Sequence, residues 1–348
     1  MPDRDLLYRC RCGQIIVVGS QRYGSILCAA HCARFYGGES LKGTDGEDGY
    51  VGRGGAGDRL GRDLRCGGCF ALGQTDDPMI VAHRAGTRDF PENTVLAITN
   101  AVAAGVDGMW LTVQVSSDGV PVLYRPSDLA TLTDGAGPVN SKTVQQLQQL
   151  NAGWNFTTPG VEGHPYRQRA TPIPTLEQAI GATPPDMTLF LDLKQTPPQP
   201  LVSAVAQVLT RTGAAGRSIV YSTNADITAA ASRQEGLQVA ESRDVTRQRL
   251  FNMALNHHCD PQPDPGKWAG FELHRDVTVT EEFTLGSGIS AVNAELWDEA
   301  SVDCFRSQSG MKVMGFAVKT VDDYRLAHKI GLDAVLVDSP LAAQQWRH

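Results

Sequence analysis

The chain has 348 residues, of which 41% are hydrophobic, and its 31 basic and 38 acidic side chains give a formal net charge of −7. Neither charge sign is gathered into a long run, so a nucleic-acid partner is not indicated. The apolar content supports a substantial core. No apolar run is long enough to cross a bilayer, which predicts a soluble protein without a transmembrane segment.

Residues 1–76 are predicted to be a cysteine- and glycine-rich, poorly ordered extension and linker. Gly, Asp and Arg crowd residues 37–68 without helical or strand periodicity. The first residues mix cysteine and arginine into short apolar runs. They do not resemble a clear secretory leader, so the compartment is left open with the cytoplasm as the default expectation.

Six of the eight cysteines lie in this extension, at positions 10, 12, 28, 32, 66 and 69. Cys66 and Cys69 have the spacing of a metal knuckle, and Cys28, His31 and Cys32 could complete a tetrahedral zinc site. The long glycine-rich gap before Cys66 makes closure of such a site entropically unfavourable. Free or redox-labile thiols are therefore favoured, and structural zinc stays open as the alternative.

From residue 77 to residue 348, short apolar runs alternate with longer amphipathic segments, the pattern of a repeated β-α unit. Strands are predicted at 79–83, 108–115, 120–124, 188–193, 218–222, 237–240, 289–293, 312–318 and 334–337. Helices are predicted at 93–104, 143–150, 201–211, 298–307 and 321–330. Because no glycine-rich phosphate loop follows the first strand, a (β/α)₈ TIM barrel is favoured over an open doubly wound sheet.

Several polar residues come at the ends of the predicted strands. In a TIM barrel the carboxyl ends of all strands meet at one mouth, where the chemistry takes place. The pattern therefore brings together His83, Arg84, Asp192, Lys194 and Asp338. Asp338, in an Asp-Ser-Pro turn, is interpreted as a structural residue that closes the last strand.

Ordered motifs over residues 79–342 resemble the glycerophosphodiester phosphodiesterase family. They are Ala82-His83-Arg84-Ala85-Gly86, Pro91-Glu92-Asn93-Thr94, Ser117 to Val122, Asp134 to Val139, Ile173 to Glu177, Leu191 to Lys194 and Gly331 to Pro340. The resemblance implies a TIM barrel that cleaves glycerophosphodiesters to glycerol 3-phosphate and an alcohol. It also implies a bound Mg²⁺ or Ca²⁺ that neutralises the charge developing on the phosphodiester, and two histidines that transfer protons.

This sequence departs from the family at its catalytic positions. The Glu-x-Asp pair of metal ligands matches Trp110 and Thr112, and neither offers a carboxylate. Asp192 matches the third metal ligand, a glutamate in the family, and is a weak metal candidate. The second histidine matches Arg125, which stays protonated and cannot act as a base. His83 is then the one catalytic candidate, and no tightly bound metal is expected.

A half-site that faces phosphate survives. Arg84 and Lys194 resemble the family's phosphate contacts, and the guanidinium of Arg125 could replace part of the missing metal charge. The residues expected to bind substrate or phosphate are Arg84, Glu92, Asn93, Arg125, Lys194 and the rim aromatic Phe316. The favoured hypothesis is a catalytically impaired pseudoenzyme that binds a phosphate-ester small molecule. A scaffold without a small ligand and an active hydrolase are the alternatives, and protein partners are left undefined.

Overall fold

The computed structural model describes residues 6–9, 15–18, 70–71, 77–308 and 310–347. The chain divides into two compact units, Met1–Gln74 and Thr75–His348. In the first unit, β1 (Leu6–Arg9), β2 (Ile15–Val18) and β3 (Phe70–Ala71) form an antiparallel sheet in the order β2-β1-β3. The sequence did not predict these strands. The six cysteines of the extension and His31 lie outside the described residues, so the zinc hypothesis stays untested.

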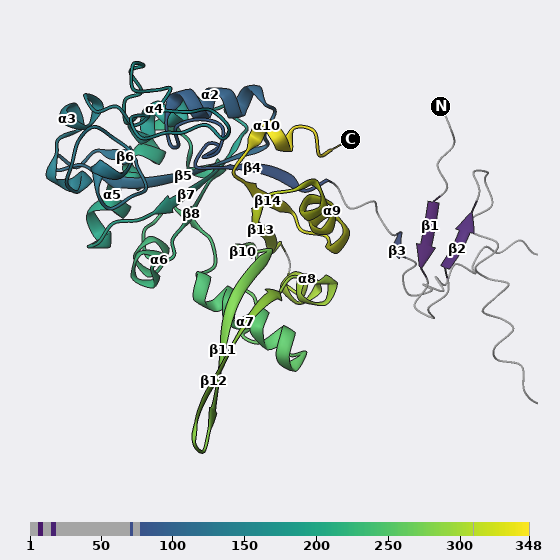
Figure 1. Cartoon of the computed structure of the whole chain (residues 1–348). Helices are drawn as coiled ribbons and strands as arrows, with labels where there is room; N and C mark the ends of the chain where they lie inside the picture. Colours follow the sequence, from purple (N-terminus) through teal and green to yellow (C-terminus); the bar gives the residue numbers. More distant parts are fainter. Residues whose placement is uncertain (1–5, 10–14, 19–69, 72–76, 309, 348) are drawn as a thin grey trace, which may run out of the picture. The chain divides into compact units, whose positions relative to one another are not determined.

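Within the described residues of the second unit, eight parallel strands form a TIM-like barrel in the order β10-β13-β14-β4-β5-β7-β8-β9 (Figure 1). A backbone hydrogen bond of 2.8 Å from Glu241 N to Trp268 O links the two ends of this order. The strands are β4 (Met79–His83), β5 (Gly108–Val115), β7 (Thr188–Leu193), β8 (Ser218–Tyr221), β9 (Gln238–Val239), β10 (Trp268–Glu272), β13 (Lys312–Val318) and β14 (Ala334–Val337). Most are near-continuous apolar runs, as expected for parallel strands buried on both faces.

Helices connect these strands and cover the barrel (Figure 1). They are α2 (Val95–Ala103), α4 (Leu176–Gly181), α5 (Pro198–Thr212), α6 (Ala225–Ser232), α7 (Arg243–Asn256), α8 (Glu299–Arg306), α9 (Val321–Ile330) and α10 (Pro340–Ala343). Side-chain caps define many of their starts. Thr175 with Gln178, and Thr320 with Asp323, form reciprocal capping boxes at α4 and α9 that satisfy otherwise unpaired backbone N–H groups.

A long connection between β5 and β7 carries short elements. β6 (Pro121–Leu123) pairs antiparallel with β5, and η1 (Leu129–Thr131), η2 (Val139–Ser141) and α3 (Val144–Gln148) follow it. These elements bury a small core of their own around Tyr124 and Leu147. The 3₁₀ turn η3 (Ala215–Arg217) precedes β8.

The interior of the barrel has its own apolar cluster, separate from the larger core between strands and helices. Trp110, Phe190, Tyr221 and Phe316 belong to this interior cluster, and all are nearly buried. The aromatic side chains fill the barrel below the mouth, so the barrel is a packed core with its polar groups at one end.

The barrel fold is confirmed, but two predicted strands lie elsewhere. The segment 120–124 contains β6, which is antiparallel and outside the barrel order. The segment 289–293 belongs to the long hairpin of β11 (His274–Phe283) and β12 (Gly286–Glu295). The sixth barrel strand is β10, which was not predicted from the sequence. Its segment Trp-Ala-Gly-Phe-Glu contains a central glycine and lacks any β-branched residue, so it has a weak strand signal.

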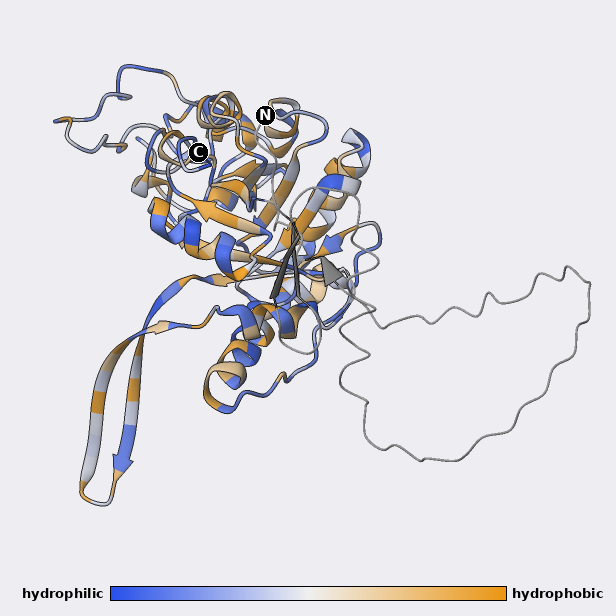
Figure 2. Cartoon of the chain, turned by 90° about the vertical axis from the view of Figure 1, so that its right-hand side faces the viewer, coloured by the Kyte–Doolittle hydropathy of each residue, from blue (hydrophilic) through white to orange (hydrophobic). Residues whose placement is uncertain are grey.

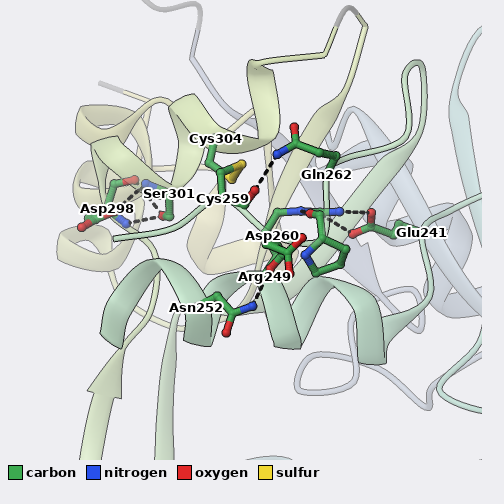
Figure 3. Close-up of a disulfide and its surroundings, with 10 residues drawn as sticks. Glu241, Arg249, Asn252, Cys259, Asp260, Gln262, Asp298, Ser301 and Cys304 are labelled. Atoms are coloured by element: carbon green, nitrogen blue, oxygen red, sulfur yellow. Dashed lines mark hydrogen bonds and ion pairs between the residues drawn. A yellow bond between two sulfur atoms is a disulfide. The ribbon is translucent and has the colours of Figure 1, made fainter. Parts of the chain in front are cut away.

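The β11–β12 hairpin leaves the barrel as a two-stranded arm (Figures 1 and 2). It is inserted between β10 and α8, on the side where strands lead into helices. Nearby, a disulfide joins Cys259, after α7, to Cys304 in α8 (Figure 3). In the described part of the chain, no helix is both long and apolar enough to span a bilayer.

Candidate functional site at the mouth of the barrel

A cavity of about 320 Å³ opens at the carboxyl ends of the barrel strands. Nine of the residues discussed from the sequence line it: His83, Arg84, Trp110, Thr112, Arg125, Asp192, Lys194, Phe316 and Asp338. Glu92 and Asn93 do not line it. The remaining lining residues are Tyr221, Thr223, Arg243, Glu272, Ala317 and Leu336.

His83 and Asp338 form a short polar contact at the mouth, at the ends of the adjacent strands β4 and β14. His83 Nδ1 lies 2.6 Å from Asp338 Oδ1. This hydrogen bond is the main cause that lowers the pKa of the Asp338 carboxyl. An ionised Asp338 can only accept, so Nδ1 carries the proton and Nε2 is the basic nitrogen of a neutral His83. Asp338 therefore orients His83, beyond the structural role predicted for its turn.

The chain turns sharply after His83. Arg84, Ala85 and Gly86 have φ values of 49°, 65° and 100°, in the left-handed region. A Cβ at Gly86 would lie 2.8 Å from Pro340 Cδ, so glycine is required by both conformation and space. The turn presents Arg84 to the cavity.

Glu92 and Asn93 support this turn. Glu92 Oε2 lies 2.7 Å from Arg84 Nη1. Asn93, itself at φ 57°, donates its backbone N–H to Arg84 O at 2.8 Å, and its Oδ1 accepts from Thr112 N at 3.0 Å. Asn93 thus ties the turn after β4 to β5. Direct contacts of Glu92 and Asn93 with phosphate stay predictions.

Asp192 and Lys194 form an ion pair on the cavity wall. Lys194 Nζ lies 3.1 Å from Asp192 Oδ1 and donates to Thr223 Oγ1 at 2.7 Å. Burial raises the pKa of the Asp192 carboxyl, and the neighbouring Lys194 ammonium opposes that shift. The one carboxylate that matches a family metal ligand is thus already faced by a cation.

Trp110 takes up the space at the position of the first missing carboxylate. Its ring centroid lies 4.9 Å from that of Tyr221 and 5.3 Å from that of Phe316. The next inward residue on β5 is Thr112, whose buried Oγ1 has no hydrogen-bond partner among the described residues. Within the described residues, no group of three His, Cys, Asp or Glu side chains could hold a metal ion. The donor set at the mouth therefore does not fit the divalent cation that the family implies.

Tyr221, Arg243 and Glu272 form a polar group that the sequence analysis did not identify. Arg243 Nη2 donates to both carboxylate oxygens of Glu272, at 2.6 and 2.7 Å. Burial is the main cause that raises the pKa of Tyr221 to about 12, so its phenol remains a donor at neutral pH. Tyr221 and Glu272 each end a strand, and Arg243 begins a helix. Glu272 was not predicted at the mouth because its strand, β10, was not predicted from the sequence.

Arg125 is the exception among the cations of the cavity. Arg84, Lys194 and Arg243 each face a carboxylate. Arg125 is exposed at the rim and has no hydrogen bond or ion pair with any described residue. The positive charge available to a ligand is therefore concentrated at Arg125 more than the sequence suggested.

Buried polar atoms without partners also gather at this cavity. In the part of the chain that the structure describes, they include Arg84 Nε, Thr112 Oγ1 and the Tyr221 hydroxyl. Leaving such a group unsatisfied costs about 1–3 kcal/mol.

The model of the glycerophosphoryl diester phosphodiesterase family matches residues 83–342. The chain therefore belongs to the glycerophosphoryl diester phosphodiesterase family. It is 96% identical over 289 residues to the uncharacterized protein Rv2277c of Mycobacterium tuberculosis, covering 83% of this chain and 96% of that protein.

Two further comparisons agree with this family. The crystal structure of the glycerophosphoryl diester phosphodiesterase domain of Rv2277c matches with a TM-score of 0.75 and 98% identity, over 78% of this chain and 100% of the domain. Mouse glycerophosphodiester phosphodiesterase 1 is 36% identical over 117 residues, which is 33% of each chain.

Proposed function

We propose that the mouth cavity binds a small phosphate ester and does not hydrolyse it with a divalent metal. One observation carries this proposal. By resemblance to the family, Trp110 and Asp192 match two metal-ligand positions, and here Trp110 packs against Tyr221 while Asp192 forms an ion pair with Lys194. A buried aromatic and an ammonium group there leave space and charge suited to an anion instead.

The cavity lining supports a ligand with both phosphate and hydroxyl groups. Arg125, Arg84 and Tyr221 line the cavity and carry N–H and O–H donors suited to phosphate oxygens, and Arg125 has no partner among the described residues. Asp192 and Thr112 also line the cavity and carry oxygens that can accept hydrogen bonds from ligand hydroxyls. Phe316 adds an apolar wall for a carbon skeleton.

Binding tests this proposal directly. Calorimetry with sn-glycerol 3-phosphate and with inorganic phosphate should detect binding to wild type at millimolar concentration. Arg125→Ala should weaken it by about 1.5–3 kcal/mol, because a charge-assisted contact is lost. Arg325→Ala, on the exposed side of α9, is the matched control and should bind as wild type does. Absence of binding, or an Arg125→Ala variant equal to wild type, would leave the barrel as a scaffold without this ligand.

A turnover assay tests the statement that the protein does not hydrolyse phosphodiesters with a divalent metal. Purified protein with glycerophosphocholine and Mg²⁺ or Ca²⁺ should release no product above background, because one carboxylate ligand and one histidine are too few. The triple variant Trp110→Glu, Thr112→Asp, Arg125→His restores the family's residues and is the comparison. Metal-stimulated turnover by wild type that disappears in Asp192→Ala would contradict the proposal.

Metal-independent hydrolysis is the second candidate, favoured by the His83–Asp338 contact. A histidine whose Nδ1–H is held by a carboxylate has Nε2 free to act as a base, and the surrounding cations could stabilise a phosphorane-like charge. Turnover in the presence of a chelator that is lost in His83→Ala would establish this candidate over pure binding.

A further inference from the structure

The β11–β12 arm is a long hairpin whose strands pair only with each other. Each strand has ten residues, paired from His274↔Glu295 to Phe283↔Gly286. A two-stranded hairpin is at best marginally stable by itself in water, and both of its outer edges present unpaired backbone groups. The arm therefore calls for a partner that covers it.

The register of the arm divides it into two unlike faces. Paired residues lie on the same face, so one face carries Val277 opposite Val292, Val279 opposite Ser290, and Phe283 opposite Gly286. The other face carries the hydrogen-bonded pair Asp276 and Asn293, with Thr278, Thr280, Glu282 and Ser287, and also Ala291 and the exposed Ile289. We call the first of these the valine face. Val279, Val292 and Phe283 on it are exposed.

Two charged side chains stand on the valine face, at equal distances from its centre. Arg275 and Glu281 lie three residues before and three residues after Thr278 along β11. Arg275 approaches Glu272 at 3.2 Å, but Glu272 is already held at 2.6 Å by Arg243. Two guanidinium groups on one carboxylate leave one positive charge uncompensated at the base of the arm. Glu281 has no cationic partner among the described residues.

We propose that the valine faces of two copies of this chain pack against each other, antiparallel and around a two-fold axis near Thr278. In a two-fold contact of this kind, a residue a given number of positions before Thr278 in one copy meets the residue the same number of positions after Thr278 in the other copy. Arg275 of one copy then faces Glu281 of the other, and Val277 faces Val279. One positive and one negative charge, evenly spaced about an apolar centre, make the face complementary to itself.

The area that the two arms can bury limits the affinity of the dimer. Ten residues of strand span about 34 Å, and a two-stranded ribbon offers a face of a few hundred Å², below the roughly 800 Å² per partner of standard interfaces. The dimer should therefore be reversible and dependent on concentration.

A membrane surface fits the arm less well. Leu285, Ile289 and Phe283 are 99%, 72% and 61% exposed near its tip, as an inserting loop would require. However, Glu281 and Glu282 lie beside them, and residues 276–295 contain no lysine or arginine to meet lipid phosphates. The exposed Val279 and Val292 of the valine face lie back from the tip, where insertion of the tip into a membrane would not need them.

Sedimentation of the full chain over a range of concentrations tests the proposal. Arg275→Glu alone and Glu281→Arg alone each place like charges opposite one another, and each should raise the dimer dissociation constant at least tenfold. An equimolar mixture of these two variants should dimerise again, because each glutamate then meets an arginine. This rescue also shows that both variants are folded. Glu282→Arg, the same change on the opposite face, should dimerise as wild type does.

A second pair probes the apolar centre. Val279→Asp should abolish dimerisation, whereas Thr280→Asp, one residue away on the other face, should preserve it. A wild type that is monomeric at every concentration, or a mixture without rescue, would overturn the proposal. Flotation of monomeric wild type with phosphatidylcholine vesicles, lost in Leu285→Asp, would overturn it in favour of a lipid surface.

Discussion

Trp110 stands next to His83 in the register of β4 and β5, and Thr112 stands next to Asp192 in the register of β5 and β7. Because of these neighbours, the replacement of the family's carboxylates at positions 110 and 112 changes the surroundings of both His83 and Asp192. Alternate residues of a barrel strand point inward, so both replaced side chains face the site. The tryptophan closes the space below the mouth with aromatic packing, and the threonine leaves only a neutral hydroxyl beside Asp192.

The ionisation of Asp338 makes the folding stability depend on pH. Its pKa is lowered by the hydrogen bond to His83, so the ionised form is favoured by folding. A carboxyl with a lowered folded pKa adds stability above its unfolded pKa and loses it as the pH falls through the folded value. The stability difference between wild type and Asp338→Asn should therefore shrink as the pH falls below the ordinary carboxyl value of 3.8.

Denaturant unfolding of both proteins from about pH 3 to about pH 7 measures this difference. Asp322→Asn, an exposed carboxylate on α9, is the control and should show no such trend. A difference that stays constant over the whole range would mean that the His83–Asp338 contact does not favour the ionised form.

At the scale of elements, a buried ion pair holds α7 against the barrel (Figure 3). Arg249, in the middle of α7, is fully buried and donates to both oxygens of Glu241 at 2.7 and 2.8 Å. Thr246 donates to the same carboxylate at 2.7 Å, and the Arg249 guanidinium lies 4.5 Å from the Phe305 ring centroid. Glu241 follows β9, so this pair fixes the helix beside the point where the barrel order closes.

Removing one partner of this pair should be costly. Arg249→Met leaves Glu241 as an uncompensated buried charge, and we expect a loss of about 3–5 kcal/mol in the free energy of unfolding. The double variant Glu241→Leu, Arg249→Met should recover much of this loss, because no charge is then buried. Arg247→Met, which affects an exposed pair on the same helix, should change little. Equal stability of Arg249→Met and wild type would contradict this account.

For the whole molecule, the Cys259–Cys304 disulfide connects the loop after α7 with α8 across 45 residues of sequence. The loop that it closes contains β10 and the entire β11–β12 arm. A disulfide is typical of proteins that mature in an oxidising compartment, and the compartment of this protein stays a prediction. In the chain-entropy account, closing a loop of this size contributes about 4 kcal/mol.

Thermal unfolding with and without a reductant tests this contribution. Reduction should lower the midpoint of wild type and leave that of the Cys259→Ala, Cys304→Ala double variant unchanged. The double variant separates this bond from the cysteines of the amino-terminal extension. A wild-type midpoint that does not respond to reduction would show that the bond adds no stability.

The sequence by itself determined the barrel and most of the residues that line its mouth. Apolar runs such as 188–193 and 334–337 are local signals, and the His-Arg and Pro-Glu-Asn-Thr motifs are recognisable without any tertiary information. The replacements at Trp110, Thr112 and Arg125 could also be identified in this way, because the recognisable motifs on either side fix their positions in the family's pattern.

Only the tertiary structure decided which side chains meet. His83 and Asp338 are 255 residues apart, and their contact depends on the pairing of β4 with β14. The same holds for Tyr221, Arg243 and Glu272, which no motif joins, and for the disulfide. The arm was missed because an apolar run in an exposed hairpin has the same local pattern as one in a buried strand. Strand order and register, which local patterns do not encode, fix these contacts.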